Sequence, residues 1–194
     1  MTPHQAILPN ALFQSRIGKV AGPVTLAILG TLIIAISARI KVPMWPVETS
    51  LQTLAVFVIA ATFGFRLGLA TIALYLAEGA FGLPVFQGTP ERGIGLAYMA
   101  GPTGGYLLGY VIMTGLTGWA ADRGWWRSPL RIGSAMLVGE VIMLTCGALW
   151  LAVLFGADKA FGYGVGPFIL PDLVKVGIAA CLAGLAGRSL RRRG

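Results

Sequence analysis

Two opposite charges stand close together in an otherwise apolar stretch near the C-terminus. In PFILPDLVKVG, residues 167–177, Asp172 and Lys175 are three positions apart and follow Pro171. Pro171 suits the first turn of a helix, and the positive end of that helix would stabilise the Asp172 carboxylate. Because residues i and i+3 share one helix face, Asp172 and Lys175 are expected to point the same way. At membrane depth each charge costs roughly 2.5–3.5 kcal/mol, so the pair indicates a functional site. The alternative is an ion pair that only neutralises itself, which at a surface contributes less than about 1 kcal/mol.

Two further acids, and the absence of several catalytic motifs, limit the functions that this sequence could have. Glu78 and Glu140 stand in apolar segments, where either could couple to protons or serve as a hydrogen-bonded structural acid. The sequence contains no Walker A motif and no HExxH motif, and its one histidine is His4. Cys146 and Cys181 stand in apolar segments, where they act as small apolar residues. We therefore expect no catalytic residues, no metal and no cofactor, and we predict recognition and transport rather than an enzyme.

The composition predicts an all-α membrane protein. Of the 194 residues, 56% are hydrophobic and 11% are charged, whereas a soluble domain has about 25% charged residues. We expect one integral membrane domain over residues 1–194, with a short cytoplasmic segment at 1–19, six spans within 20–187 and a basic cytoplasmic tail at 188–194. The expected transmembrane helices are 20–38, 51–65, 67–81, 98–121, 132–155 and 169–187.

The basic residues gather at the edges of these segments and predict the orientation. Six spans place both termini on one side, and that side holds ten basic residues against four on the other. The ten are Arg16, Lys19, Arg66, Arg123, Arg127, Arg131, Arg188, Arg191, Arg192 and Arg193. The four are Arg39, Lys41, Arg92 and Lys159. Because cytoplasmic loops are richer in Lys and Arg, both termini are expected in the cytoplasm, and the net charge of +8 does not imply a nucleic-acid partner.

Two predicted outer loops are unusually apolar for connectors. RIKVPMWPVETS follows the first segment, and FGLPVFQGTPERGIG follows the third. Such loops could fold back as a lid over a binding site. The alternative is an aromatic belt at the membrane interface, which accounts for Trp45 better than for Val85 and Phe86.

Small residues recur at four-residue steps on two predicted helices. The glycine set of the fourth segment is expected to let another helix backbone approach closely. The Ala/Thr set of the first segment suits either internal packing or a partner helix. The members are Gly101, Gly105 and Gly109 in GPTGGYLLG, and Ala27, Thr31 and Ala35 in the first segment.

Four motifs together resemble a known family. KVPMWPVETSLQTLAVF, LYLAEGAFGLPVFQG, GPTGGYLLGY and LPDLVK occur in the order and spacing found in BioY-type biotin transporters, the substrate-binding S components of energy-coupling-factor (ECF) transporters. The resemblance covers residues 38–177, with departures at Glu48-Thr49 and at Glu78. It implies six helices around an outward-facing cavity, which the loops after the first and third spans would cover.

The resemblance also implies roles for individual residues. Asp172 and Lys175 are associated with the ureido ring of biotin, whose two N–H donors and one carbonyl acceptor suit a carboxylate and an ammonium group. Four aromatic residues are candidate walls for the apolar part of biotin, namely Trp45, Phe86, Tyr75 and Tyr106. The biotin carboxylate needs a cation, for which Arg92 and Lys41 are candidates, and Arg92 is preferred because its planar fork matches a carboxylate.

By the resemblance, the chain is expected in the cytoplasmic membrane, and its implied partners are a transmembrane coupling subunit and two cytoplasmic ABC-type ATPases. The face formed by Ala27, Thr31 and Ala35 is a candidate docking surface for the coupling subunit. The sequence also allows two rival functions. One is a solitary transporter driven by protons through Glu78 or Glu140, and the other is an S component for another vitamin such as riboflavin or thiamine.

Overall fold

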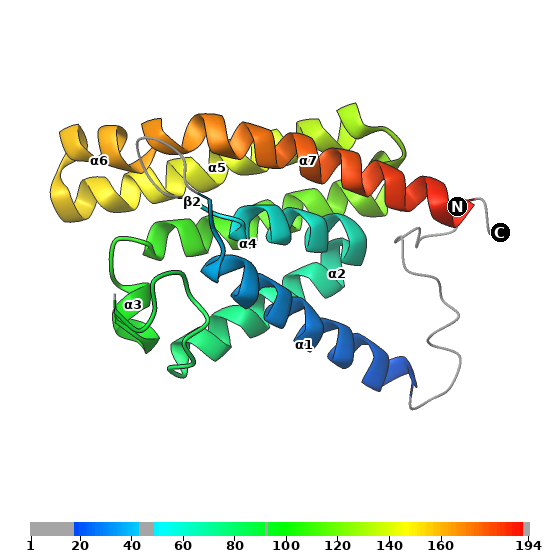
Figure 1. Ribbon diagram of the computed structural model, residues 1–194, viewed down its shortest axis with the longest axis horizontal. Helices are drawn as coiled ribbons and strands as arrows, with labels where there is room; N and C mark the ends of the chain where they lie inside the picture. The colour runs from blue at the N-terminus through cyan, green and yellow to red at the C-terminus, as the bar shows by residue number, and fades with distance from the viewer. Residues whose placement is uncertain (1–17, 43–48, 92, 192–194) are drawn as a thin grey trace.

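Long helices form the body of the computed structural model, which describes residues 18–42, 49–91 and 93–191. The long helices are α1 (Gly18–Arg39), α2 (Gln52–Ala80), α4 (Gly104–Asp122), α5 (Pro129–Phe155) and α7 (Gly166–Arg191). The short elements are β1 (Lys41–Val42), β2 (Thr49–Ser50), α3 (Gly95–Met99), η2 (Trp125–Arg127) and α6 (Ala157–Gly164). Figure 1 shows α5 and α7 side by side, with α4 between this pair and the layer of α1 and α2.

Four helices in the described part of the chain are long and apolar enough to cross a membrane. They lie within Ala21–Arg39, Gln52–Ala80, Pro129–Phe155 and Gly166–Ala186. These helices make the chain a membrane protein and agree with the all-α prediction. The prediction of six spans depends on α4, which has 19 residues, and on how α2 is divided.

A glycine divides α2 where the sequence predicts the end of one span and the start of the next. A straight helix of 29 residues would be about 44 Å long, which exceeds the roughly 30 Å of a bilayer core. Gly64 interrupts the helix with φ 75° and ψ −170°, a conformation that suits glycine. The N–H of Phe65 donates to Asp122 Oδ2 at 3.1 Å, so the end of α4 stabilises this turn.

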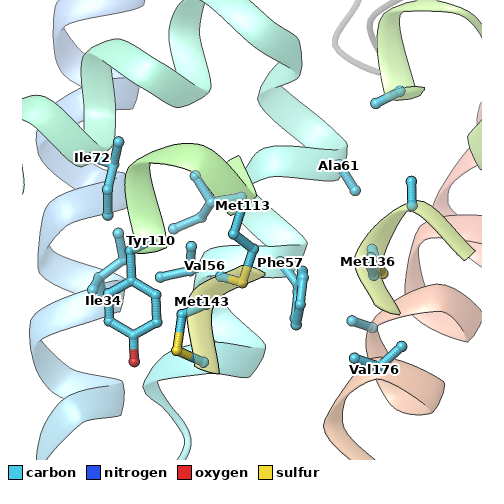
Figure 2. Close-up of a cluster of buried hydrophobic side chains, with 14 of the residues drawn as sticks. Ile34, Val56, Phe57, Ala61, Ile72, Tyr110, Met113, Met136, Met143 and Val176 are labelled. Carbon is cyan, nitrogen blue, oxygen red and sulfur yellow. The ribbon is translucent and has the colours of Figure 1, made fainter. Parts of the chain in front are cut away.

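One buried cluster joins the long helices. Figure 2 shows Ile34 of α1, Val56 of α2, Met113 of α4 and Met143 of α5 gathered in this core. Each of these side chains is at most 3% exposed. The apolar residues of α1 that face away from the cluster, from Ile28 at 45% to Ile36 at 62%, are exposed and suit contact with lipid.

The predicted glycine face of the fourth span is split between a turn and a helix. The sequence predicts this span from residue 98, but residues 95–99 form the separate helix α3 and α4 begins at Gly104. Gly105 and Gly109 lie against α5, where a Cβ at Gly109 would be 2.6 Å from Met143 Cα. Gly101 precedes α4, and its carbonyl accepts a hydrogen bond from Trp150 Nε1 at 2.8 Å. The close helix contact therefore involves two of the three glycines.

The small-residue face of α1 is turned toward α2. Thr31 is 1% exposed, and its Oγ1 lies 3.0 Å from Glu78 Oε1 in a hydrogen bond. Ala27 is buried, and the half-buried Ala35 packs against the core. Of the two alternatives, the structure favours internal packing, so it does not support the prediction that this face docks a coupling subunit.

Candidate functional site

A cavity of about 760 Å³ opens between the end of α1, the first turns of α2 and α4, the middle of α5 and the first half of α7. Its walls come from the start of α2, the loop at 87–91, α3, α4, α5 and α7. The polar side chains on these walls include Gln52, Thr53, Tyr106, Tyr110 and Asp172. This volume is in the range of small-molecule sites. The lining mixes polar and charged side chains with aromatic and aliphatic ones, so the cavity suits a ligand that has both polar and apolar parts.

The charged pair lies at this cavity. Lys175 Nζ is 2.7 Å from Asp172 Oδ1, and the two residues are 5% and 2% exposed. Asp172 is among the residues that line the cavity. A buried pair of this kind has given up its hydration, so its retention needs a reason other than stability.

The helix that carries the pair begins earlier than the sequence predicts. The sequence places the start of the last span at residue 169 and Pro171 in its first turn, but α7 begins at Gly166 and Pro171 lies inside it. The positive end of the helix is therefore not what holds the Asp172 carboxylate, and this part of the prediction is wrong. The ammonium group of Lys175 holds it instead.

Tyr75 and Phe86 lie beside the cavity wall rather than on it. They are 0% and 1% exposed, and neither is among the residues that line the cavity. The Tyr75 hydroxyl accepts a hydrogen bond from Gln52 Nε2 at 3.0 Å and donates one to the Val85 carbonyl at 3.1 Å. The Phe86 ring lies between Tyr75 and Tyr98, with centroids 5.3 Å and 4.9 Å away. The two rings therefore anchor the loop that follows α2, and the Tyr75 hydroxyl also positions Gln52.

Four aromatic side chains form or approach the cavity from α3, α4 and α7. Tyr98, Tyr106, Tyr110 and Phe168 all line it. The Tyr106 hydroxyl donates to the Gly164 carbonyl at 2.6 Å, and its ring lies 6.2 Å from that of Phe168. Of these four residues, only Tyr106 was predicted from the sequence as a wall of the binding site. The spacing of four between Tyr106 and Tyr110 was an available signal, because it places both on one face of α4.

Two basic side chains stand where the cavity meets the loops. Lys41 and Arg39 both line the cavity and are exposed. The Arg39 guanidinium donates to the Pro84 carbonyl at 2.6 Å, which ties the end of α1 to the loop after α2. Trp45 and Arg92, the other predicted binding residues, lie outside the described residues.

The two acids inside predicted spans have different surroundings. Glu78 accepts the hydrogen bond from Thr31 and so has a structural partner. Glu140 is 4% exposed, and neither of its carboxyl oxygens has a hydrogen-bond partner among the described residues. Its charged neighbours are Asp172 and Lys175.

The match to a family model covers nearly the whole chain. Residues 11–192 match the model of the BioY family. The chain belongs to the BioY family. A probable biotin transporter BioY of Pyrococcus horikoshii is 36% identical over 163 residues, which cover 84% of this chain and 94% of that protein. The biotin transporter BioY2 of Lactococcus lactis is 35% identical over 165 residues, which cover 84% of this chain and 87% of that protein.

A solved structure supports the fold of this BioY-family chain. The crystal structure of the S-component for biotin from an ECF-type ABC transporter superposes with a TM-score of 0.76. The match covers 93% of this chain and 96% of that one, at 22% sequence identity. The fold is therefore that of an ECF S component, as the motifs predict.

Proposed function

We propose that this protein binds biotin and mediates its uptake across the cytoplasmic membrane as the S component of an ECF transporter. The related proteins of Pyrococcus horikoshii and Lactococcus lactis carry the names of biotin transporters. The observation that carries the proposal is the buried pair of Asp172 and Lys175 at the cavity. The protein is a transporter component and not an enzyme.

The ureido ring of biotin matches this pair in donors and acceptors. Its N–H groups donate to the Asp172 carboxylate, and its carbonyl accepts from the Lys175 ammonium group. A neutral ureido ring that offers both edges replaces part of the hydration that the two charges gave up. Buried polar groups of this kind also reject ligands that lack the matching edges.

The rest of the biotin molecule suits the remaining walls of the cavity. Its fused ring is apolar, and Tyr98, Tyr106 and Phe168 offer aromatic surface. Its carboxylate needs a cation near the mouth, where Lys41 lines the cavity. In this proposal the mouth opens to the outside, and the loops after α1 and α2 close over the bound ligand.

Transport needs an energy source that the sequence does not contain. Since there is no Walker A motif, we propose that a transmembrane coupling subunit and two cytoplasmic ATPases supply it. In this arrangement the chain has six spans and both termini are cytoplasmic. The candidate docking face on α1 packs internally, so the coupling subunit would contact a different surface.

A binding comparison among vitamins tests the proposed function. Calorimetric titration of the purified protein with biotin, riboflavin and thiamine should show the tightest binding for biotin. Tighter binding of either other vitamin would overturn the assignment. Uptake of labelled biotin by cells that express the protein with and without ECF partners tests the mechanism. Full uptake without partners that survives ATP depletion would favour the proton-driven alternative.

A further inference from the structure

Glu140 is a buried acid that the recognition of biotin leaves without a role. It lies on α5, is 4% exposed, and has no hydrogen-bond partner for either carboxyl oxygen among the described residues. The other acid in a predicted span, Glu78, has its hydrogen bond from Thr31 at 3.0 Å. Buried polar groups nearly always have a partner, so an acid that lacks one at this depth requires an explanation.

The groups around Glu140 connect it to the biotin anchors. Across the contact between α5 and α7, its charged neighbours are Asp172 and Lys175. On α4, Tyr110 is the titratable residue that interacts with it. A hollow of about 560 Å³ between α5, α6 and α7 reaches Glu140, and its other lining residues carry no charge. The carboxyl group therefore lies outside the cavity and next to Asp172, which lines it, and to Lys175.

The charges of this cluster balance only with one additional proton. Lys175 Nζ is 2.7 Å from Asp172 Oδ1, so one ammonium group already balances one carboxylate. A second ionised carboxylate would be repelled by Asp172 and could not donate to it, because two carboxylates are both acceptors. A protonated Glu140 carboxyl group can instead donate a hydrogen bond to the neighbouring Asp172 carboxylate. The cluster is therefore balanced when the Glu140 carboxyl group holds a proton.

We propose that Glu140 is a positioning residue. In its protonated form it does not compete for the Lys175 ammonium group, which can then contact both Asp172 and the ligand. This inference rests on the proposed function. When Glu140 loses its proton, two carboxylates compete for one ammonium group, and Lys175 is drawn away from the ureido carbonyl. The protonated state therefore binds biotin more tightly, and the affinity falls as the pH rises. Over this range the ureido group of biotin stays neutral and its carboxylate stays ionised.

The pH profile of biotin affinity tests this role. Calorimetry on the full-length protein in detergent, from about pH 6 to about pH 10, should show a Kd that rises roughly tenfold or more at the alkaline end. Glu140→Gln keeps the shape and polarity of the neutral acid, so its Kd near pH 7 should stay within about threefold of wild type. This variant should lack the alkaline rise. Glu78→Gln is the matched control, because it neutralises the acid bonded to Thr31 and should keep the wild-type profile.

A measurement on the wild-type protein makes the test independent of any variant. Binding that prefers the protonated state takes up protons at alkaline pH, and titrations in buffers of different ionisation enthalpy measure this uptake. Absence of uptake, a flat wild-type profile, or an unchanged alkaline rise in Glu140→Gln would overturn the inference. Failure of the wild-type protein to bind biotin near pH 7 would instead overturn the proposed function.

Discussion

Asp172 and Asp122 are both aspartates on long apolar helices, but they occupy contrasting surroundings. Asp172 is 2% exposed, is paired with Lys175 at 2.7 Å and lines a cavity. Asp122 is exposed at the far end of α4, whose first turns line that cavity, and it accepts a hydrogen bond from the Phe65 N–H. The Asp172 carboxylate pairs with a side chain next to an open cavity, whereas the Asp122 carboxylate accepts a backbone N–H and stabilises a turn.

The packing around the two aspartates differs in the same way. At the cavity that Asp172 lines, the buried side chains of Tyr75 and Phe86 support the loop after α2 without filling the cavity. Near Asp122, Gly118 of α4 lies against the turn at Gly64, with no room for a Cβ. Variants at the cavity should therefore change ligand affinity, and variants at the turn should change the free energy of unfolding.

The largest effect is expected at the cavity. Asp172→Asn keeps the shape but turns one acceptor edge into a donor, which leaves an N–H of the ureido ring without an acceptor. A lost hydrogen bond to a charged group costs about 1.5–3 kcal/mol, so the Kd for biotin should rise roughly tenfold or more. Asp158→Asn, on the exposed first turn of α6, is the matched control and should bind as wild type does. Unchanged affinity in Asp172→Asn would contradict the proposed role.

The next effect is expected at the turn and should leave binding intact. A Cβ at Gly118 would be 2.7 Å from the Gly64 carbonyl carbon, so Gly118→Ala forces the backbones apart. Overpacking of this kind costs about 1–3 kcal/mol of unfolding free energy, which thermal unfolding in detergent would detect. On the same helix, a Cβ at Gly115 would meet only side-chain atoms at 3.7 Å or more, so Gly115→Ala is the control. Equal stability of the two variants would break the proposed contrast.

A smaller loss of stability is expected from the carboxylate itself. Asp122→Ala removes the acceptor of the Phe65 N–H, and the loss of such a cap costs about 0.5–2 kcal/mol. Asp122→Asn retains an acceptor oxygen and should recover most of the stability in the same unfolding measurement. A change in biotin affinity for either variant would show that the two ends of the bundle are coupled.

The sequence predicted the charged pair and the helix division better than the walls of the cavity. The spacing of Asp172 and Lys175 predicts a shared helix face, and the two groups are in contact. The turn at Gly64 lies close to the predicted interruption because a bilayer limits helix length. These two features depend on local spacing and on dimensions that the sequence expresses directly.

The orientation of the aromatic residues could not be obtained in this way. The long helices are apolar on most faces, so periodicity does not distinguish a side that faces the core from one that faces a cavity. Tyr75 was predicted as a wall and lies behind it, whereas Tyr98 and Phe168 line the cavity without a sequence signal. Their placement depends on contacts between the loop after α2 and distant helices, which spacing along one helix does not encode.

The smallest effect separates two basic residues at the mouth of the cavity. Lys41 and Arg39 both line it, but Arg39 also donates to the Pro84 carbonyl and so holds the loop. Exposed charge pairs contribute little, so Lys41→Ala should weaken biotin only about two- to threefold. Biotin amide, which lacks the negative charge, should bind this variant as it binds wild type. Arg39→Ala should weaken both ligands equally, because it loosens the loop rather than removing a charge partner.

The ratio of the two losses decides which cation serves the carboxylate. If Lys41→Ala weakens biotin and biotin amide equally, Lys41 acts on the loop and not on the charge of the ligand. Arg92, the preferred candidate from the sequence, is then the next position to test with the same two ligands. A selective loss in Arg92→Ala but not in Lys41→Ala would assign the carboxylate to the loop after α2. The opposite result would assign the carboxylate to the loop after α1. The ureido end of biotin would then be held by α7 and the carboxylate end by the segment that follows α1.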